Sequence, residues 1–280
     1  MAINPARHSL YTSLRRFAAL IVLLCGWAAS ASAQVSVSGP LTVEVELEPG
    51  ATHTGTIILE NVGPRPAEVK LYQTDYRSES PALYFYDDPG STPRSNASWI
   101  TVSPLRFSIP AESQYTVPFT IEVPADPSLS GTYWSILMVE PVPPGSPESA
   151  TAPEGEVSLG VVTILRYGVR LITNVGEPGT VQPEITNARL ELRDGAPTLG
   201  IEVANAGTRL LRNEIWAELY DEDGQLVARQ DGSGGTLFPG STVEYRVPLA
   251  EVPRGVYTAL VVIDSGDNNV FAVSLSLSLQ

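Results

Sequence analysis

The sequence predicts an all-β protein: two tandem immunoglobulin-like β-sandwiches that follow a cleaved signal peptide. Apolar residues recur with a period of two in short runs, which is typical of half-buried strands. Clusters of proline, glycine and asparagine separate these runs, and no window after Gln34 sustains the i, i+3, i+4, i+7 spacing of an amphipathic helix. The strand and turn pattern also occurs twice in the same order, which predicts two sandwiches in place of one.

The first 33 residues have the three parts of a secretory signal peptide. Arg7, Arg15 and Arg16 precede an apolar run of 13 residues, Phe17 to Ala29, and Ala31-Ser-Ala33 provides a small-residue cleavage site. The apolar run is shorter than the roughly 20 residues of a membrane-spanning helix. We therefore expect export to the periplasm or the cell exterior, without stable membrane insertion.

The charge and the cysteine count restrict the classes of partner and chemistry. The chain carries a net charge of −14, and removal of three leader arginines leaves 14 basic against 31 acidic residues. This excess of acid opposes binding to nucleic acid. Cleavage also removes the only cysteine and leaves one histidine, His53, which we place in a solvated turn. We expect no metal, no cofactor and no catalytic activity.

Eight short strands are expected in a first domain, residues 34–176. Each has alternating or continuous apolar residues and ends near proline, glycine or asparagine. They are Leu41–Leu47, Thr56–Glu60, Ala67–Tyr76, Leu83–Tyr86, Trp99–Val102, Arg106–Ile109, Tyr115–Val123 and Gly131–Val139.

Residues 177–280 repeat this pattern and form the second expected domain. The strand that ends in Asn61-Val-Gly63 corresponds to one that ends in Asn205-Ala-Gly207, where asparagine and glycine tolerate the backbone of a tight turn. A hairpin is expected around Asp221 to Asp223. The strict alternation of Phe271 to Leu279 predicts a last strand with one buried and one wet face.

The stretch from Glu156 to Asn174 is the longest β-rich run without proline. Leu159, Val161, Leu165, Val169 and Leu171 share one face of an extended chain. A proline- and serine-rich loop precedes this run. Such a strand is either the closing strand of the first sandwich or a surface offered to a partner.

The end of this stretch, Val169-Arg-Leu-Ile-Thr173, resembles the last first-domain strand of PapD-like periplasmic pilus chaperones. The signal peptide, the two immunoglobulin-like domains and the loose loop before the strand are similar as well. The resemblance implies that the strand is lent to an incomplete secreted or pilus-type subunit by β-strand addition, with an outer-membrane usher as a further partner. Leu159, Val161, Thr163 and Leu165 would then face the client's groove, and Arg170 would grip its terminal carboxylate. In the pilus chaperones an arginine of the first strand assists, whereas Val35 to Leu47 holds no basic residue.

The first domain also resembles that of WxL-interacting cell-surface proteins. The similar segments are Trp99 to Pro104, Phe107 to Pro110, Val117 to Asp126 and Gly131 to Trp134. This resemblance implies an alternative function, a cell-surface or cell-wall-binding adhesion module, in which Trp99, Tyr133 and Trp134 either stack on sugars or fill the core. A hydrolase that uses facing carboxylates in an interdomain cleft is a third hypothesis.

Overall fold

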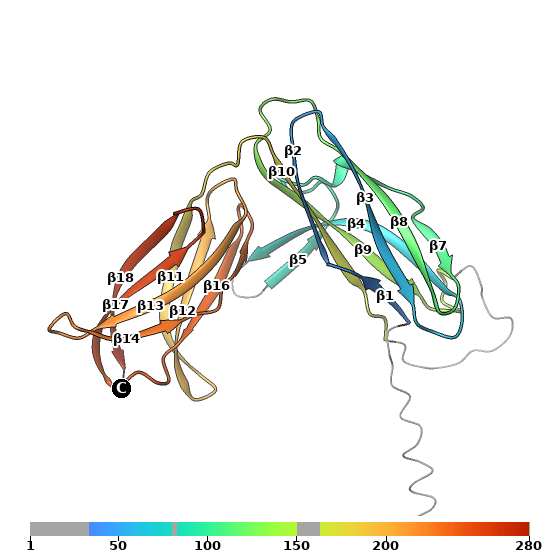
Figure 1. Ribbon diagram of the computed structural model, residues 1–280. Helices are drawn as coiled ribbons and strands as arrows, with labels where there is room; N and C mark the ends of the chain where they lie inside the picture. Colours follow the sequence, from blue (N-terminus) through green and yellow to red (C-terminus); the bar gives the residue numbers. More distant parts are fainter. Residues whose placement is uncertain (1–33, 80–82, 150–162, 280) are drawn as a thin grey trace, which may run out of the picture.

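The computed structural model describes residues 34–79, 83–149 and 163–279. The expected leader, residues 1–33, lies outside the described residues, as do two of the predicted partner-binding residues, Leu159 and Val161. The described chain forms two β-sandwiches that meet like an inverted V, with strand β5 of the first reaching into the space between them (Figure 1). The predicted all-β class with two tandem immunoglobulin-like sandwiches is confirmed.

The first sandwich consists of β1 to β10 in two facing sheets. One sheet has the order β1-β3-β8-β6, and the other has the order β2-β10-β9-β4-β5 with β7 paired to β4. The strands are β1 Val35–Ser38, β2 Thr42–Leu47, β3 Thr52–Asn61, β4 Ala67–Glu79, β5 Leu83–Asp87, β6 Ile100–Val102, β7 Arg106–Ile109, β8 Ser113–Glu122, β9 Gly131–Val142 and β10 Tyr167–Val175. A short 3₁₀ turn, η1 Ala97–Trp99, precedes β6.

The second sandwich is built from β11 to β18. Its sheets have the orders β11-β12-β16 and β14-β13-β17-β18, with β15 paired to β13, and none of them includes a strand of the first sandwich. The strands are β11 Pro183–Arg193, β12 Ala196–Asn205, β13 Leu211–Tyr220, β14 Leu226–Asp231, β15 Gly235–Leu237, β16 Thr242–Pro248, β17 Gly255–Asp264 and β18 Val270–Leu279.

The first two strands close the first sandwich because they belong to different sheets. β1 pairs with β3 in one sheet, and β2 runs parallel to β10 in the other. The change of sheet occurs at Gly39, whose φ of 125° is a conformation that residues with a Cβ rarely adopt. This crossing leaves β2 alongside only the second part of β10, from Arg170 to Val175.

The repeated Asn-x-Gly turns have the same buried contacts in both sandwiches. Asn61 is fully buried, and its Nδ2 donates to the backbone carbonyls of Arg65, Ile109 and Pro110 at 2.8–3.1 Å, while its Oδ1 accepts from the amide of Gly63 at 2.9 Å. Asn205 uses its amide group in the same way, donating to the carbonyls of Arg209 and Leu237 and accepting from the amide of Gly207. The asparagine was recognisable in the sequence as a turn residue, and it also joins the turn to a distant strand.

Three expectations about single segments can be compared with the structure. The last strand and its alternation are confirmed by β18, and Asp221 accepts backbone hydrogen bonds in the predicted hairpin between β13 and β14. The placement of His53 in a turn is wrong, because β3 begins at Thr52 and His53 pairs with Ile121.

The prediction of one strand from Glu156 to Asn174 is also wrong in its described part. β10 begins only at Tyr167, and residues 163–166 have no assigned secondary structure and no ladder partner within the described chain. The register pairs Tyr167 with Val139, so a longer β10 would bring Leu165 opposite Pro141. Proline has no N–H to donate, and the pairing therefore stops before it.

Replacing Asn61 by alanine is predicted to destabilise the protein by about 2–3 kcal/mol, because the variant leaves buried carbonyls and one amide without a partner. Urea unfolding measures this loss. Asn187→Ala is the matched control, since Asn187 is exposed on β11, and it should change the free energy of unfolding little. Equal effects of the two substitutions would contradict the structural role of Asn61.

Candidate functional site

The site is built on β10, whose two margins differ along its length. β9 pairs antiparallel with all of β10, from Tyr167 to Val175. β2 covers the other margin only from Arg170 onward, where the amide of Arg170 donates to the carbonyl of Leu41 at 2.9 Å. Tyr167 to Val169 therefore have one unpaired margin within the described chain, and residues 163–166 have no ladder partner on either side.

Odd-numbered side chains of β10 face the core of the first sandwich. Val169, Leu171 and Val175 are completely buried in the first sandwich. Thr163 and Leu165 have odd numbers as well, but they precede β10 and are exposed, Leu165 to 51%. The structure thus places these two predicted partner-binding residues outside the core of the sandwich, just before the strand begins.

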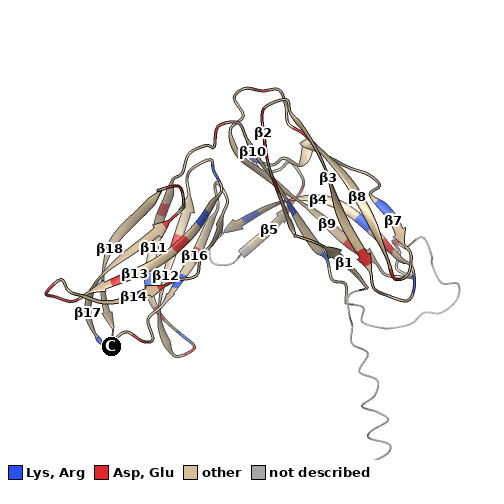
Figure 2. Cartoon of the chain, in the orientation of Figure 1, with Lys and Arg blue, Asp and Glu red and all other residues tan. Residues whose placement is uncertain are grey.

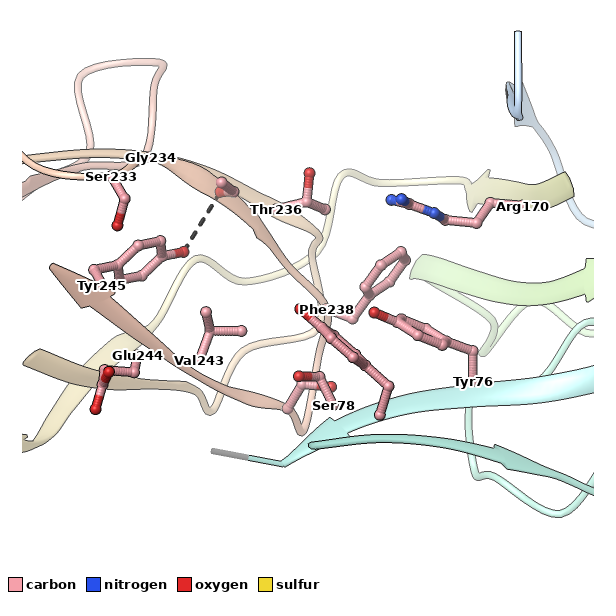
Figure 3. Close-up of a pocket in the computed structure, with 13 residues that line it drawn as sticks. Tyr76, Ser78, Arg170, Ser233, Gly234, Thr236, Phe238, Val243, Glu244 and Tyr245 are labelled. Atoms are coloured by element: carbon pink, nitrogen blue, oxygen red, sulfur yellow. Dashed lines mark hydrogen bonds between the residues drawn. The ribbon is translucent and has the colours of Figure 1, made fainter. Parts of the chain in front are cut away.

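The even-numbered side chains face the second sandwich. Ile172 is buried against Trp134, Leu210 and Phe238, which form an apolar cluster between the sandwiches. Arg170 lies one step earlier on this face and lines a cleft pocket of about 270 Å³ together with residues of β4, β5, β15 and β16 (Figure 3). The described site residues therefore separate, because Arg170 lies on the face of β10 toward the second sandwich, whereas Thr163 and Leu165 are exposed before β10 begins.

Arg170 differs from its neighbour Arg166 in having no acidic partner within the described chain. Arg166 pairs with Glu140 at 3.0 Å. The pocket also contains Glu244, but Arg246 lies 2.7 Å from this carboxylate and Arg189 also binds it. A half-buried guanidinium without a counter-ion attracts an anion, because its burial is otherwise uncompensated. Opposite it on β2 stands Thr42, so no second basic residue of the first strand assists.

Aromatic side chains form the wall of the pocket beside Arg170. Tyr76 of β4 stacks on Tyr84 of β5, with ring centroids 5.8 Å apart, and meets the edge of Phe238 at 5.9 Å. Burial raises the pKa of the Tyr76 phenol to about 12, and the nearby Tyr84 adds to this effect. Tyr76, Tyr84 and Phe238 were not among the site residues expected from the sequence. The alternation Leu83-Tyr-Phe-Tyr86 was the available signal, since it leaves one row of tyrosines exposed.

A joint between the sandwiches fixes the position of this pocket. The amide of Thr132 donates to the carbonyl of Thr208 at 2.9 Å, and its hydroxyl accepts from the amide of Leu210 at 3.0 Å. Glu44 of β2 also forms an ion pair with Arg212 of β13. These contacts, together with the apolar cluster, hold the β4–β5 hairpin against the second sandwich.

Charged residues do not gather on one face in the way that a nucleic-acid surface requires. Figure 2 shows lysine and arginine interspersed with acidic residues on both sandwiches. Among the described residues, no group of three or more histidine, cysteine, aspartate or glutamate side chains is placed to hold a metal ion. The helices within the described ranges include none that is long and apolar enough to cross a membrane.

The aromatic residues of the alternative surface-binding hypothesis are packed inward. Trp134 is 3% exposed in the interdomain cluster, and its Nε1 donates to the carbonyl of Tyr76. Trp99 contacts Tyr133 at a centroid distance of 4.6 Å against the first core. Trp134 therefore fills the cluster between the sandwiches, whereas Trp99 and Tyr133 are partly buried against the first core. For the hydrolase hypothesis, Glu244 is the one carboxylate among the described residues that line the Arg170 pocket.

Several solved structures of fimbrial chaperones are similar to this chain. The class 5 fimbriae chaperone CfaA is 9% identical, with 86% of this chain and 98% of that chain covered at a TM-score of 0.46. The Escherichia coli chaperone DraB is 15% identical, with 86% and 98% covered at a TM-score of 0.41. A chain in the complex of the Salmonella enterica SafA pilin with the SafB chaperone is 15% identical, with 88% and 99% covered at a TM-score of 0.41.

No family model and no curated protein sequence matches the chain. At these identities the likeness to PapD-like pilus chaperones, expected from the sequence, is a likeness of fold. The assignment of the fold itself rests on the strand pairing of this chain.

Replacing Gly131 by alanine is predicted to open the joint. Gly131 has a φ of 78°, and an added Cβ would lie 2.3 Å from the carbonyl oxygen of Thr208. The radius of gyration from small-angle X-ray scattering should therefore rise. Gly90→Ala is the control, because Gly90 has a similar φ of 83° but open space around it. An unchanged radius for Gly131→Ala would show that this contact does not hold the sandwiches together.

The raised pKa of Tyr76 predicts a loss of stability between pH 10 and about 12. In this window the unfolded phenol, with a pKa of 10.0, has ionised while the folded one has not, so unfolding releases a proton and becomes more favourable as the pH rises. Tyr76→Phe should reduce this loss, measured by urea unfolding at pH 8 and pH 11. Tyr115→Phe is the comparison, because the Tyr115 ring stacks on Phe107 and is not among the groups that shift the pKa of Tyr76, and identical pH dependence in both variants would refute the prediction.

Proposed function

We propose that the protein is an exported, non-catalytic, chaperone-like protein that binds secreted or pilus-type subunits by β-strand addition. The observation that carries this proposal is the start of β10: within the described chain, Tyr167 to Val169 have one unpaired margin, and Leu165 and Thr163 just before them are exposed. An incoming strand can pair with this backbone while the exposed side chains enter the groove of the client.

The position of β2 determines where the client strand must end. β2 runs parallel to β10 and begins beside Arg170. A client strand that pairs with the same margin of residues 163–169 would therefore lie directly before the start of β2, in the position that an N-terminal extension of β2 would have. The chain that leads into β2 at Leu41 blocks continuation past Arg170. A strand parallel to β10 therefore meets this block with its C-terminus.

Arg170 has the chemistry to hold that chain end. A guanidinium binds a carboxylate through two parallel N–H donors, and Arg170 forms no ion pair in the described part of the chain, since Glu244 of the same pocket is bound by Arg189 and Arg246. Both charge and geometry thus favour a client that ends in a free carboxylate beside β2. Since Arg170 itself is paired on both margins, the strand that is lent is Thr163 to Val169 and does not include Arg170.

The class of partner follows from this mode of binding. A client must expose a groove that lacks one strand, as an incomplete immunoglobulin-like subunit does. SafB is found in complex with the SafA pilin, and we extend this class of client to the present chain together with an outer-membrane usher and a periplasmic location. A cell-wall-binding module is the alternative outcome of the test below.

Arg170→Ala is predicted to lower client capture at least tenfold, because the terminal carboxylate loses its charged partner. The measurement is co-purification of the tagged mature protein, residues 34–280, from the periplasm of its own cell, with mass spectrometry of the bound subunits. Arg166→Ala is the matched control, since Arg166 lies just before β10 but pairs with Glu140, and it should retain capture.

A second variant tests the strand itself. Leu165→Asp places a charge in the exposed segment just before β10 and should also abolish capture of β-rich subunits without unfolding the protein, because Leu165 is 51% exposed. Full capture by both Arg170→Ala and Leu165→Asp would overturn the proposal. Retention of the protein on isolated cell wall, with no subunit bound, would favour the alternative.

A further inference from the structure

The tyrosines of the β4–β5 hairpin are not needed for strand addition, yet one of them lies open beside Arg170. Tyr84 is 53% exposed although it lies in the cleft between two sandwiches. Its ring stacks on Tyr76 on one side, with an interplanar angle of 16°. Tyrosine is enriched at binding surfaces because a large rigid ring gives contact area at a small entropic cost.

The opposite wall of the pocket comes from the second sandwich. Val243 and Tyr245 line it, and Tyr245 is locked in place because its hydroxyl accepts a 3.0 Å hydrogen bond from Asn213. Phe238 also lines the pocket, but it is 4% exposed and already meets the edge of Tyr76. The pocket has a volume of about 270 Å³. An apolar cavity of about 150 Å³ is large enough to hold a benzene molecule. The space between the walls therefore admits one aromatic side chain (Figure 3).

The charges around the pocket favour a ring that is attached to an anion. Arg170 stands at the end nearest the first sandwich, whereas Glu244 is neutralised by the arginines that bind it. A ligand with a carboxylate and a ring on the same residue can pair with the guanidinium and place its ring against the exposed side of Tyr84. The C-terminal residue of a peptide has both groups within a few bonds of each other.

We propose that Tyr76, Tyr84 and Phe238 form a side-chain subsite for an aromatic residue at the very C-terminus of the client. This inference rests on the proposed function, since that function brings the client's chain end to Arg170. The ring of the client stacks against Tyr84 or meets its edge, and aromatic pairs in either arrangement gain energy beyond their buried area. The subsite selects clients by their last side chain, whereas the β10 edge accepts any strand of suitable pattern.

The test uses four synthetic peptides with one uncharged, alternating apolar sequence. They end in phenylalanine or alanine, each as the free acid or the amide, and their affinities for the mature protein are measured by calorimetry. The acid that ends in phenylalanine should bind about tenfold more tightly than the acid that ends in alanine. Tyr84→Ser should reduce this ratio to about one and leave the ratio of acid to amide unchanged.

Two control variants separate the contribution of the aromatic subsite from that of Arg170, which binds the terminal carboxylate. Tyr86→Phe keeps the ring that contacts Tyr76 and removes only a hydroxyl of a residue that does not line the pocket, and it should change neither ratio. Arg170→Met should abolish the preference for the acid over the amide and leave the preference for phenylalanine. Because Tyr84 and Tyr86 are both more than half exposed, these substitutions leave the core intact.

The outcomes distinguish failure of the subsite from failure of the proposed function. If the acid is preferred through Arg170 but phenylalanine and alanine bind equally, the aromatic subsite is wrong and the strand-addition proposal stands. If all four peptides fail to bind, or the acid has no advantage, both are overturned. An aromatic preference that survives Tyr84→Ser places the ring elsewhere, and glycan binding that requires Tyr84 would assign the pocket to a sugar.

Discussion

The backbone pairing of β10 is the constraint on which the rest of the account depends. Two features set its limits: Pro141 ends the ladder with β9 before Leu165, and the chain enters β2 only at Arg170. Between these limits β10 begins with one margin unpaired within the described chain, and the residues just before it are exposed. A segment that is firmly held at one end and unpaired at the other is suited to complete a foreign sheet, because its register is already fixed by the buried residues that follow it.

The joint between the sandwiches also makes one face of β10 the side of a cleft. Ile172 uses the same face of β10 as Arg170 and buries itself against Leu210 and Phe238. The hydrogen bonds of Thr132 hold the second sandwich at this position. As a result, the guanidinium of Arg170 and the rings of Tyr76 and Tyr84 face one pocket, although they come from strands far apart in the sequence. Recognition of a chain end and of its last side chain can therefore occur together.

Local patterns predicted the parts of this structure that depend on local physics. Alternation revealed β18 and the inward row of β10, and the repeated Asn-x-Gly turns revealed the relation of the two sandwiches, now explained by the buried amides of Asn61 and Asn205. Non-local pairing was not predictable in the same way. The length of β10 depends on which residue of β9 falls opposite Leu165, and the pocket depends on a β4–β5 hairpin that meets a loop of another domain. In a single sequence, a tyrosine that is exposed to solvent and a tyrosine that lines a cleft occupy the same alternating pattern, so the pattern does not distinguish them.

Hydrogen–deuterium exchange of the mature protein, with and without a bound subunit, tests the central claim most directly. Amides of residues 163–169 that lack a ladder partner should exchange quickly in the free protein and become protected when the client is bound, whereas Leu171 to Val175 are protected in both states because β2 and β9 already flank them. Unchanged exchange over residues 163–169 in a complex that demonstrably contains the subunit would contradict strand addition at this edge.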